Sequence, residues 1–149
     1  MDNITIKQIK ENKKQYIDML FLADPDENML DKYLEKGDMF VLEKDGIAVC
    51  EAVVEKISDT ECELKNIATR EEFQKRGFAS KMIDFLFSYY CGKFSVMLVG
   101  TAENGRDFYS KQGFEYSHTV KDFFVDNYPE PVIDNGVLCV DMIYFRKIL

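Results

Sequence analysis

The segment Gln74–Ser80, with the sequence QKRGFAS, decides the architecture because it lies where a strand pattern gives way to a helical one. Upstream, Cys62–Ala68 alternates between polar and apolar residues, as a half-buried strand does. Downstream, apolar residues recur at helical spacing until Gly92, a residue type that commonly ends helices. A strand that turns directly into an amphipathic helix brings unpaired N–H groups and the positive end of the helix dipole to one point. The segment therefore predicts an anion-binding turn.

The residues of this turn suit a phosphate. Gly77 would let a phosphate oxygen approach the main chain, and Ala79 is small enough not to block it. Lys75 and Arg76 add positive charge, and residues 64–81 form a basic island in a chain whose net charge is −8. Such an island fits a phosphorylated small molecule, although a chance cluster of charges on a solvated helix face explains it equally well.

Two better-known phosphate loops do not match the chain. It contains no G-x-G-x-x-G pattern. The glycines Gly100 and Gly105 have the spacing of a P-loop, but Arg106 and Asp107 follow them in place of Lys and Ser or Thr. We therefore do not expect a nucleoside triphosphatase.

Outward from the turn, the sequence predicts one continuous alternation of elements. Before it, the predicted segments are a strand over 4–7, helices over 16–23 and 29–34, and an antiparallel meander over 39–42, 47–54 and 62–68. After it, they are a helix from 74, a strand over 94–99, a helix over 105–112, and strands over 114–119 and 137–145. The order β-α-α-β-β-β-α-β-α-β-β indicates an α/β fold with a mixed sheet.

Composition bounds the class of protein. The chain has 149 residues, of which 46% are hydrophobic and 31% charged, so we expect a single globular domain over 1–149. The first residues lack a basic segment followed by a long apolar run, which favours a cytoplasmic location without membrane association. The net charge of −8 disfavours nucleic-acid binding, because phosphate neutralisation supplies most of that affinity.

The four cysteines are widely spaced and form no C-x-x-C pair. We interpret Cys50, Cys62, Cys91 and Cys139 as reduced residues, mostly in the core, and predict no metal site because the tetrahedral spacing is missing.

Two motifs resemble those of the GNAT acetyltransferases. Gln74-x-x-Gly77-x-Ala79 resembles the family signature Q/R-x-x-G-x-G/A, and Phe108–Phe114 (FYSKQGF) resembles the second motif, F/L-Y-x-K-x-G-F. They occur in the family's order, and the resemblance covers about residues 4 to 120. It implies a mixed, mostly antiparallel sheet with helices on both faces, and transfer of acetyl from acetyl-CoA to an amine. The residues after 120 resemble a bacterial subgroup.

The resemblance also implies a cofactor site. The backbone of Ile67, Ala68 and Thr69 would pair with the pantetheine arm like an extra strand, where the neighbouring strand splays away. The pyrophosphate would contact the turn, made of Gln74, Lys75, Arg76, Gly77, Phe78, Ala79 and Ser80. Asn104 lies near a family position that contacts CoA, but two residues closer to the tyrosine than in many relatives, so capping of a helix is an alternative.

Tyr109 matches the family position whose hydroxyl protonates or hydrogen-bonds the departing thiolate. Without the motif, Tyr109 would be interpreted as an aromatic residue of the core. A protonated amine must lose a proton before it attacks, and Glu63 occupies the position of the general base in the histone-acetylating branch. Glu51, Glu61 or a water molecule could serve as the base instead. The non-catalytic interpretation of Glu63 is a solvated carboxylate on a strand. His118, the single histidine, is interpreted as a packing or surface residue.

The predicted enzyme transfers acetyl directly to a primary amine, since no cysteine adjoins a plausible base. The alternative is a non-catalytic acyl-CoA-binding module for sensing or interaction. The family would place the acceptor between residues 21–27 and 116–134, whose excess of acids predicts a cationic acceptor. The sequence is also compatible with a homodimer.

Overall fold

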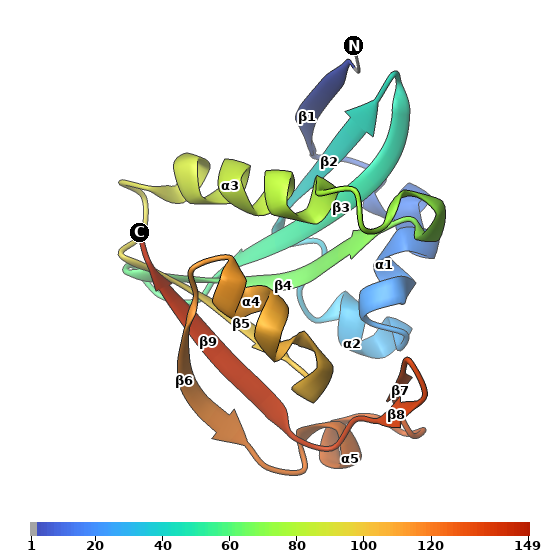
Figure 1. The fold of residues 1–149 in the computed structure, drawn as a ribbon, viewed down its shortest axis with the longest axis vertical. Coiled ribbons are helices and arrows are strands. Elements are labelled where there is room, and N and C mark those ends of the chain that lie inside the picture. Colours follow the sequence, from blue (N-terminus) through green and yellow to red (C-terminus); the bar gives the residue numbers. More distant parts are fainter. Residues whose placement is uncertain (1–2) are drawn as a thin grey trace.

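A computed structural model describes residues 3–149 and contains a central sheet of seven strands in the order β1-β2-β3-β4-β5-β9-β6 (Figure 1). β4 and β5 are parallel, and the other neighbouring strands of this sheet are antiparallel. The strands are β1 (Ile4–Ile9), β2 (Asp38–Lys44), β3 (Ile47–Lys56), β4 (Glu61–Thr69), β5 (Val96–Thr101), β6 (Glu115–Val120) and β9 (Met142–Ile148). The fold is therefore the predicted mixed, mostly antiparallel α/β sheet.

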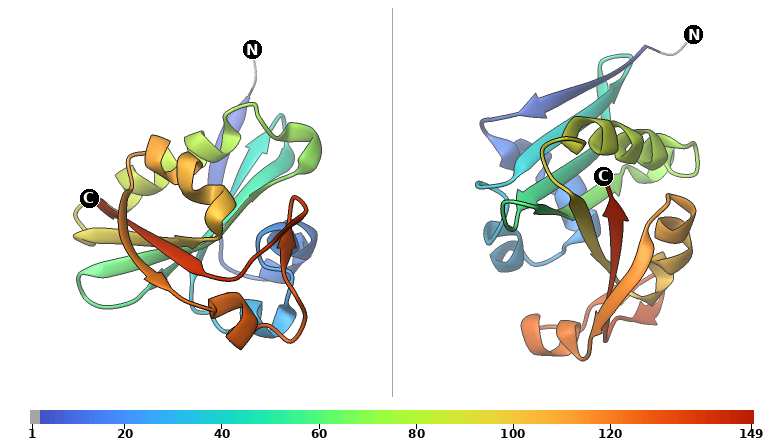
Figure 2. Two further views of the ribbon diagram at one scale, coloured as in Figure 1. Left: turned by 60° about the horizontal axis from the view of Figure 1, so that its bottom comes forward. Right: turned by 90° about the vertical axis from the view of Figure 1, so that its left-hand side faces the viewer.

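Helices cover both faces of the sheet (Figures 1 and 2). On one face, the 3-10 helix η1 (Lys13–Tyr16), α1 (Ile17–Ala23) and α2 (Glu27–Asp31) enclose a small apolar core. On the other, α3 (Phe78–Tyr90) and α4 (Arg106–Lys111) enclose a larger one. No helix within residues 3–149 is both long and apolar enough to cross a bilayer.

The C-terminal segment between β6 and β9 lies near α1 and α2 (Figure 2). It contains α5 (Phe123–Asn127) and a small hairpin of β7 (Ile133–Asp134) and β8 (Val137–Leu138). Two short 3-10 helices, η2 (Glu71–Phe73) and η3 (Glu103–Gly105), complete the elements. The two segments predicted to flank an acceptor are thus side by side.

Local sequence explains several of these elements. Asp45 and Gly46 both have positive φ, 52° and 84°, as the predicted tight hairpin between β2 and β3 requires. The predicted amphipathic helix forms as α3, which buries its apolar side against the sheet. Its buried residues are Phe78, Met82, Ile83, Leu86 and Tyr90.

The prediction of one strand over 137–145 was wrong. Asn135 and Gly136 adopt positive φ angles of 51° and 79° and form the turn of the β7–β8 hairpin. Residues 137–138 therefore form β8, which pairs antiparallel with β7 and not with the central sheet. The chain then leaves this hairpin and re-enters the main sheet at Met142. An apolar run alone cannot distinguish one long strand from two short ones that serve different sheets. The short helix α5 was also missed.

Candidate functional site

The site begins where two parallel strands separate. β4 and β5 pair from Glu61↔Val96 to Leu64↔Val99, after which β4 continues to Thr69 without pairing to β5. On its other edge β4 remains paired with β3, but the register shifts there. Val53 is opposite Asn66 and Val54 is opposite Leu64, so Lys65 is the extra residue of a β-bulge.

This separation leaves a free strand edge. Across residues 65–69, the edge of β4 that faces β5 has no strand partner among the described residues. Such an edge can pair with an extended ligand as if the ligand were another strand. It includes Ile67, Ala68 and Thr69, the residues predicted to bind the pantetheine arm.

The predicted anion-binding turn follows directly. Lys75 and Gly77 have positive φ angles of 63° and 86°, and α3 begins at Phe78 without a side-chain cap. The first helical hydrogen bond is Lys81 N to Gly77 O, so the preceding amides of α3 have no partner within the helix. A Cβ on Gly77 would meet no atom within 4 Å, so the glycine is favoured by its backbone conformation rather than by crowding.

Side chains stabilise the turn from both ends. Gln74 Nε2 donates to the Thr69 carbonyl at 3.1 Å and closes the segment between β4 and α3. Gln112 Nε2 donates to Ser80 Oγ at 2.7 Å and links the ends of the two sequence motifs. Arg76 lies over the ring of Phe73, 5.4 Å from its centroid. The side chain of Phe78 is buried in the core beneath α3.

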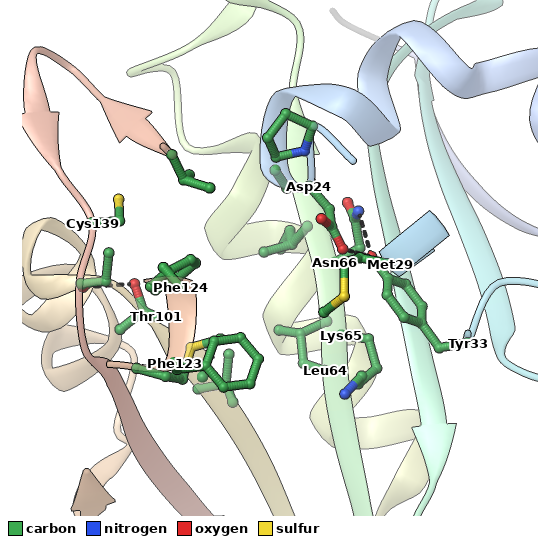
Figure 3. A pocket seen from close by; sticks show the side chains of 18 of the residues that line it. Asp24, Met29, Tyr33, Leu64, Lys65, Asn66, Thr101, Phe123, Phe124 and Cys139 are labelled. Carbon is green, nitrogen blue, oxygen red and sulfur yellow. Dashed lines mark hydrogen bonds between the residues drawn. The ribbon is translucent and has the colours of Figure 1, made fainter. Parts of the chain in front are cut away.

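A cavity of about 670 Å³ opens beside the separated strands (Figure 3). One wall consists of the α1–α2 region and β4, and the opposite wall consists of β5, α5 and residues 128–142. In Figure 3, Asp24, Tyr33 and Asn66 lie across the space from Phe123 and Phe124. The two segments predicted to flank an acceptor therefore line the same cavity.

Tyr109 of α4 lines this cavity and is only 9% exposed. Its ring packs edge-on against Phe108 and Phe114, with centroids 5.1 Å and 5.7 Å away. Its hydroxyl has no hydrogen-bond partner within residues 3–149. Burial, and secondarily the nearby Glu51, raises the pKa of the phenol well above its usual value. The phenol is thus neutral and holds a proton that it can donate.

The three candidate carboxylates occupy different environments. Glu63 lines the cavity, and burial raises its pKa although the Lys65 ammonium, 3.3 Å away, opposes the shift. Glu61 does not line the cavity. Glu51 is fully buried and does not line the cavity, and neither carboxylate oxygen has a hydrogen-bond partner among the described residues. Of the three, only Glu63 reaches the cavity.

Two further residues considered in the sequence, Asn104 and His118, do not line the large cavity. Asn104 is in η3, outside the large cavity, and its Nδ2 donates to the Asp134 carbonyl at 3.0 Å. It thus anchors the β7–β8 hairpin, and its contact with CoA stays a prediction. His118 stacks on Tyr144, with ring centroids 4.7 Å apart and planes 7° apart, which is a packing role. No group of metal-binding residues occurs within 3–149.

A buried polar network was not predicted. Asp24, 7% exposed, accepts hydrogen bonds from Tyr33 Oη at 2.8 Å and Tyr128 Oη at 2.7 Å. Asn66 Nδ2 donates to Tyr33 Oη and to the Leu20 carbonyl, both at 3.1 Å. From the sequence, Asp24 is one of several acids in the predicted wall segment 21–27. No local spacing connects it to Tyr128, 104 residues later.

Comparison with known proteins identifies the family. A profile of the acetyltransferase (GNAT) domain matches residues 35–116, more than half of the chain. The chain belongs to the GNAT family of acetyltransferases. The match includes the separated strand, the turn and Tyr109, so the family motifs and the observed site coincide.

Similar GNAT proteins are bacterial. The uncharacterized N-acetyltransferase YvbK of Bacillus subtilis (strain 168) is 29% identical over 147 residues, which cover 96% of this chain and 95% of that protein. A GNAT family acetyltransferase from Elizabethkingia anophelis, solved with acetyl-CoA bound, is 32% identical over the whole of both chains, with a TM-score of 0.93. A Bacillus subtilis acetyltransferase solved in complex with CoA is 28% identical over 99% of both chains, with a TM-score of 0.88.

Proposed function

We propose that this GNAT protein transfers an acetyl group from acetyl-CoA to a primary amine, with Tyr109 as general acid and Glu63 as general base. The observation that carries the proposal is the position of Tyr109, which lines the cavity beside the separated strands and whose hydroxyl has no hydrogen-bond partner among the described residues. Acetyl-CoA, when bound, supplies a thioester carbonyl that an amine nitrogen can attack.

The backbone supports the choice of co-substrate. The free edge of Ile67, Ala68 and Thr69 offers alternating donors and acceptors to the amides of an extended arm. The amides from Gly77 to Ser80, together with the charges of Lys75 and Arg76, offer donors to a pyrophosphate. These two features adjoin one another and suit the two chemically different parts of CoA.

Two side chains would move the protons. Glu63, with its raised pKa, can take a proton from the bound ammonium directly or through one water. Nitrogen then forms a C–N bond as the C–S bond breaks, and Tyr109 gives its proton to the departing thiolate. The transfer is direct, because no described cysteine thiol adjoins a base in the cavity; Cys139, which lines it, has its pKa raised by burial.

We also propose that the acceptor is cationic, although the wall acids contribute unequally. Of the acids counted in the two predicted wall segments, Asp24 and Asp134 line the cavity. Glu55 and Glu63 line it as well, but they pair with Lys36 at 2.8 Å and Lys65 at 3.3 Å. The cation preference therefore depends on few carboxylates.

A screen tests the proposal. The protein would be incubated with acetyl-CoA and a panel of primary amines, and released CoA would be measured with a thiol reagent. We expect CoA release that depends on an amine, together with acetylated product by mass spectrometry. Tight binding of acetyl-CoA without transfer to any amine would favour the alternative, a non-catalytic acyl-CoA-binding module.

A further inference from the structure

The cavity contains one buried carboxylate without a counter-ion. Asp24 makes no ion pair with a lysine or arginine of residues 3–149; the groups that donate to it are neutral, the hydroxyls of Tyr33 and Tyr128. It also ends α1, where the helix dipole disfavours an anion. Burial is the main cause that raises its pKa, which the two phenols partly oppose. Stability alone does not favour such a placement.

The other charges of the cavity are largely neutralised. Lys36 pairs with Glu55, and Lys65 pairs with Glu63. The remaining charged residues of the lining are Lys32 and Asp134, both exposed to solvent. Asp24 is therefore the buried carboxyl group in the lining whose ionised form a cationic ligand would stabilise.

Asp24 also has room for a further donor. A carboxylate has about four acceptor positions. The hydroxyls of Tyr33 and Tyr128 occupy one acceptor position on each oxygen of Asp24. The backbone amide of Asp26, which also favours the ionised form, occupies a third. At least one acceptor position is left for a ligand, and only a hydrogen-bond donor, best a charged one, can use it.

The wall opposite Asp24 is aromatic (Figure 3). Phe123 and Phe124 both line the cavity, with ring centroids 5.4 Å apart, and Phe124 stacks on Tyr128 at 5.6 Å. Pro25 and Met29 add apolar surface on the near side. A ligand in this space meets one anion on one side and aromatic faces on the other.

We propose that Asp24 binds the ammonium group of the acceptor and that Phe123 and Phe124 contact an aromatic or bulky apolar body attached to it. The inference rests on the proposed acetyl transfer and narrows its acceptor to apolar primary amines without a carboxylate next to the amine. A carboxylate at that position would lie close to Asp24 and be repelled. Tyr33 and Tyr128 are positioning residues that hold the Asp24 carboxylate in place.

The test compares 2-phenylethylamine with L-phenylalanine, which has the same ring and amino group but an added carboxylate. We expect the wild type to acetylate 2-phenylethylamine with a kcat/KM at least tenfold higher. Asp24→Asn should raise the KM for 2-phenylethylamine at least tenfold, change kcat less than threefold, and leave acetyl-CoA affinity unchanged. Asp24→Glu, which keeps the charge, should restore part of the loss. Asp31→Asn, the same change at an exposed α2 position outside the cavity, is the matched control.

Different failures have different meanings. A wild type that prefers phenylalanine, or that acetylates other amines but neither of these two, overturns the inference while the acetyltransferase remains. An Asp24→Asn variant with unchanged KM also overturns it. If that variant does not fold, the wild-type ratio between the two acceptors still decides. Absence of transfer to every amine in the screen would instead reject the proposed function.

Discussion

The two sides of the cavity are built in different ways. The proposed cofactor side uses the backbone of one continuous segment, residues 65–80, in which a bulge, a free strand edge and a left-handed turn follow one another. The acceptor side uses side chains from segments as distant as Asp24 and Tyr128. The first side is specified by local sequence, and the second exists only in the folded chain. Tyr109 lines the cavity that these two sides enclose.

The largest effect on kcat should come from a change at Tyr109. Tyr109→Phe keeps the ring between Phe108 and Phe114 and removes only the unpartnered hydroxyl. We expect kcat to fall roughly 10²-fold or more, with little change in acetyl-CoA affinity, as for loss of a general acid. Steady-state kinetics with an identified acceptor measures this. Tyr89→Phe on α3 is the control, and wild-type turnover in Tyr109→Phe would assign the residue to packing.

Glu63 tests whether the acceptor side supplies the base. Glu63→Gln should lower kcat roughly 10²-fold and remove the acidic limb of the pH–rate profile. A base works when deprotonated, so its raised pKa puts the wild-type limb at higher pH than an ordinary glutamate would. Lys65→Gln removes a charge that lowers this pKa, and should move the limb to still higher pH. Glu61→Gln, a change outside the cavity, should alter neither; loss of the limb in that variant would assign the base to Glu61.

The turn tests the cofactor side alone. Gly77→Ala and Gly77→Glu share the cost of placing a side chain at φ 86°, about 1–2 kcal/mol, but only the second adds a negative charge. We expect Gly77→Glu to bind acetyl-CoA at least tenfold more weakly than Gly77→Ala, about 1.4 kcal/mol. Isothermal titration calorimetry measures both. Equal affinities in folded variants would contradict the phosphate site.

The smallest effect concerns Glu51 of β3, a fully buried residue opposite Ala68 of β4. Burial raises its pKa well above the usual value, so the folded protein keeps a proton that the unfolded chain loses. Glu51 should therefore reduce stability as pH rises from its unfolded pKa toward its folded one, by at most about 1.4 kcal/mol per pH unit. Glu51→Gln should flatten this dependence in denaturant titrations at several pH values. An unchanged dependence would mean that Glu51 ionises in the folded protein.

The strand, turn and helix of the proposed cofactor side were predicted well because local rules govern them. Alternation indicated β4, helical periodicity indicated α3, and Gly77 marked the turn between them. The two linked motifs added Tyr109. Each of these signals lies within a few residues of the feature that it describes.

The acceptor side could be predicted only in outline. Residues 21–27 and 116–134 were expected to be walls, but the choice of Asp24 among their acids depends on burial and on the hydroxyl groups of Tyr33, which follows α2, and of Tyr128. The C-terminal segment was misread for a related reason. Its apolar residues serve a small hairpin and a central strand in turn, and a one-dimensional pattern does not separate them.

The place of β9 in the sheet has a consequence for biosynthesis. β9 lies between β5 and β6, although β6 precedes it in the chain. It also holds the far end of β5 in register, through Gly100↔Tyr144 and Thr101↔Ile143, beside the cavity. While the ribosome has released residues only as far as β6, that strand has no partner in the sheet, whereas every residue of the turn before α3 is already available. A nascent or truncated chain without β9 would carry this turn without the strand that pairs with β5 beside the cavity, so we expect such a chain to be inactive.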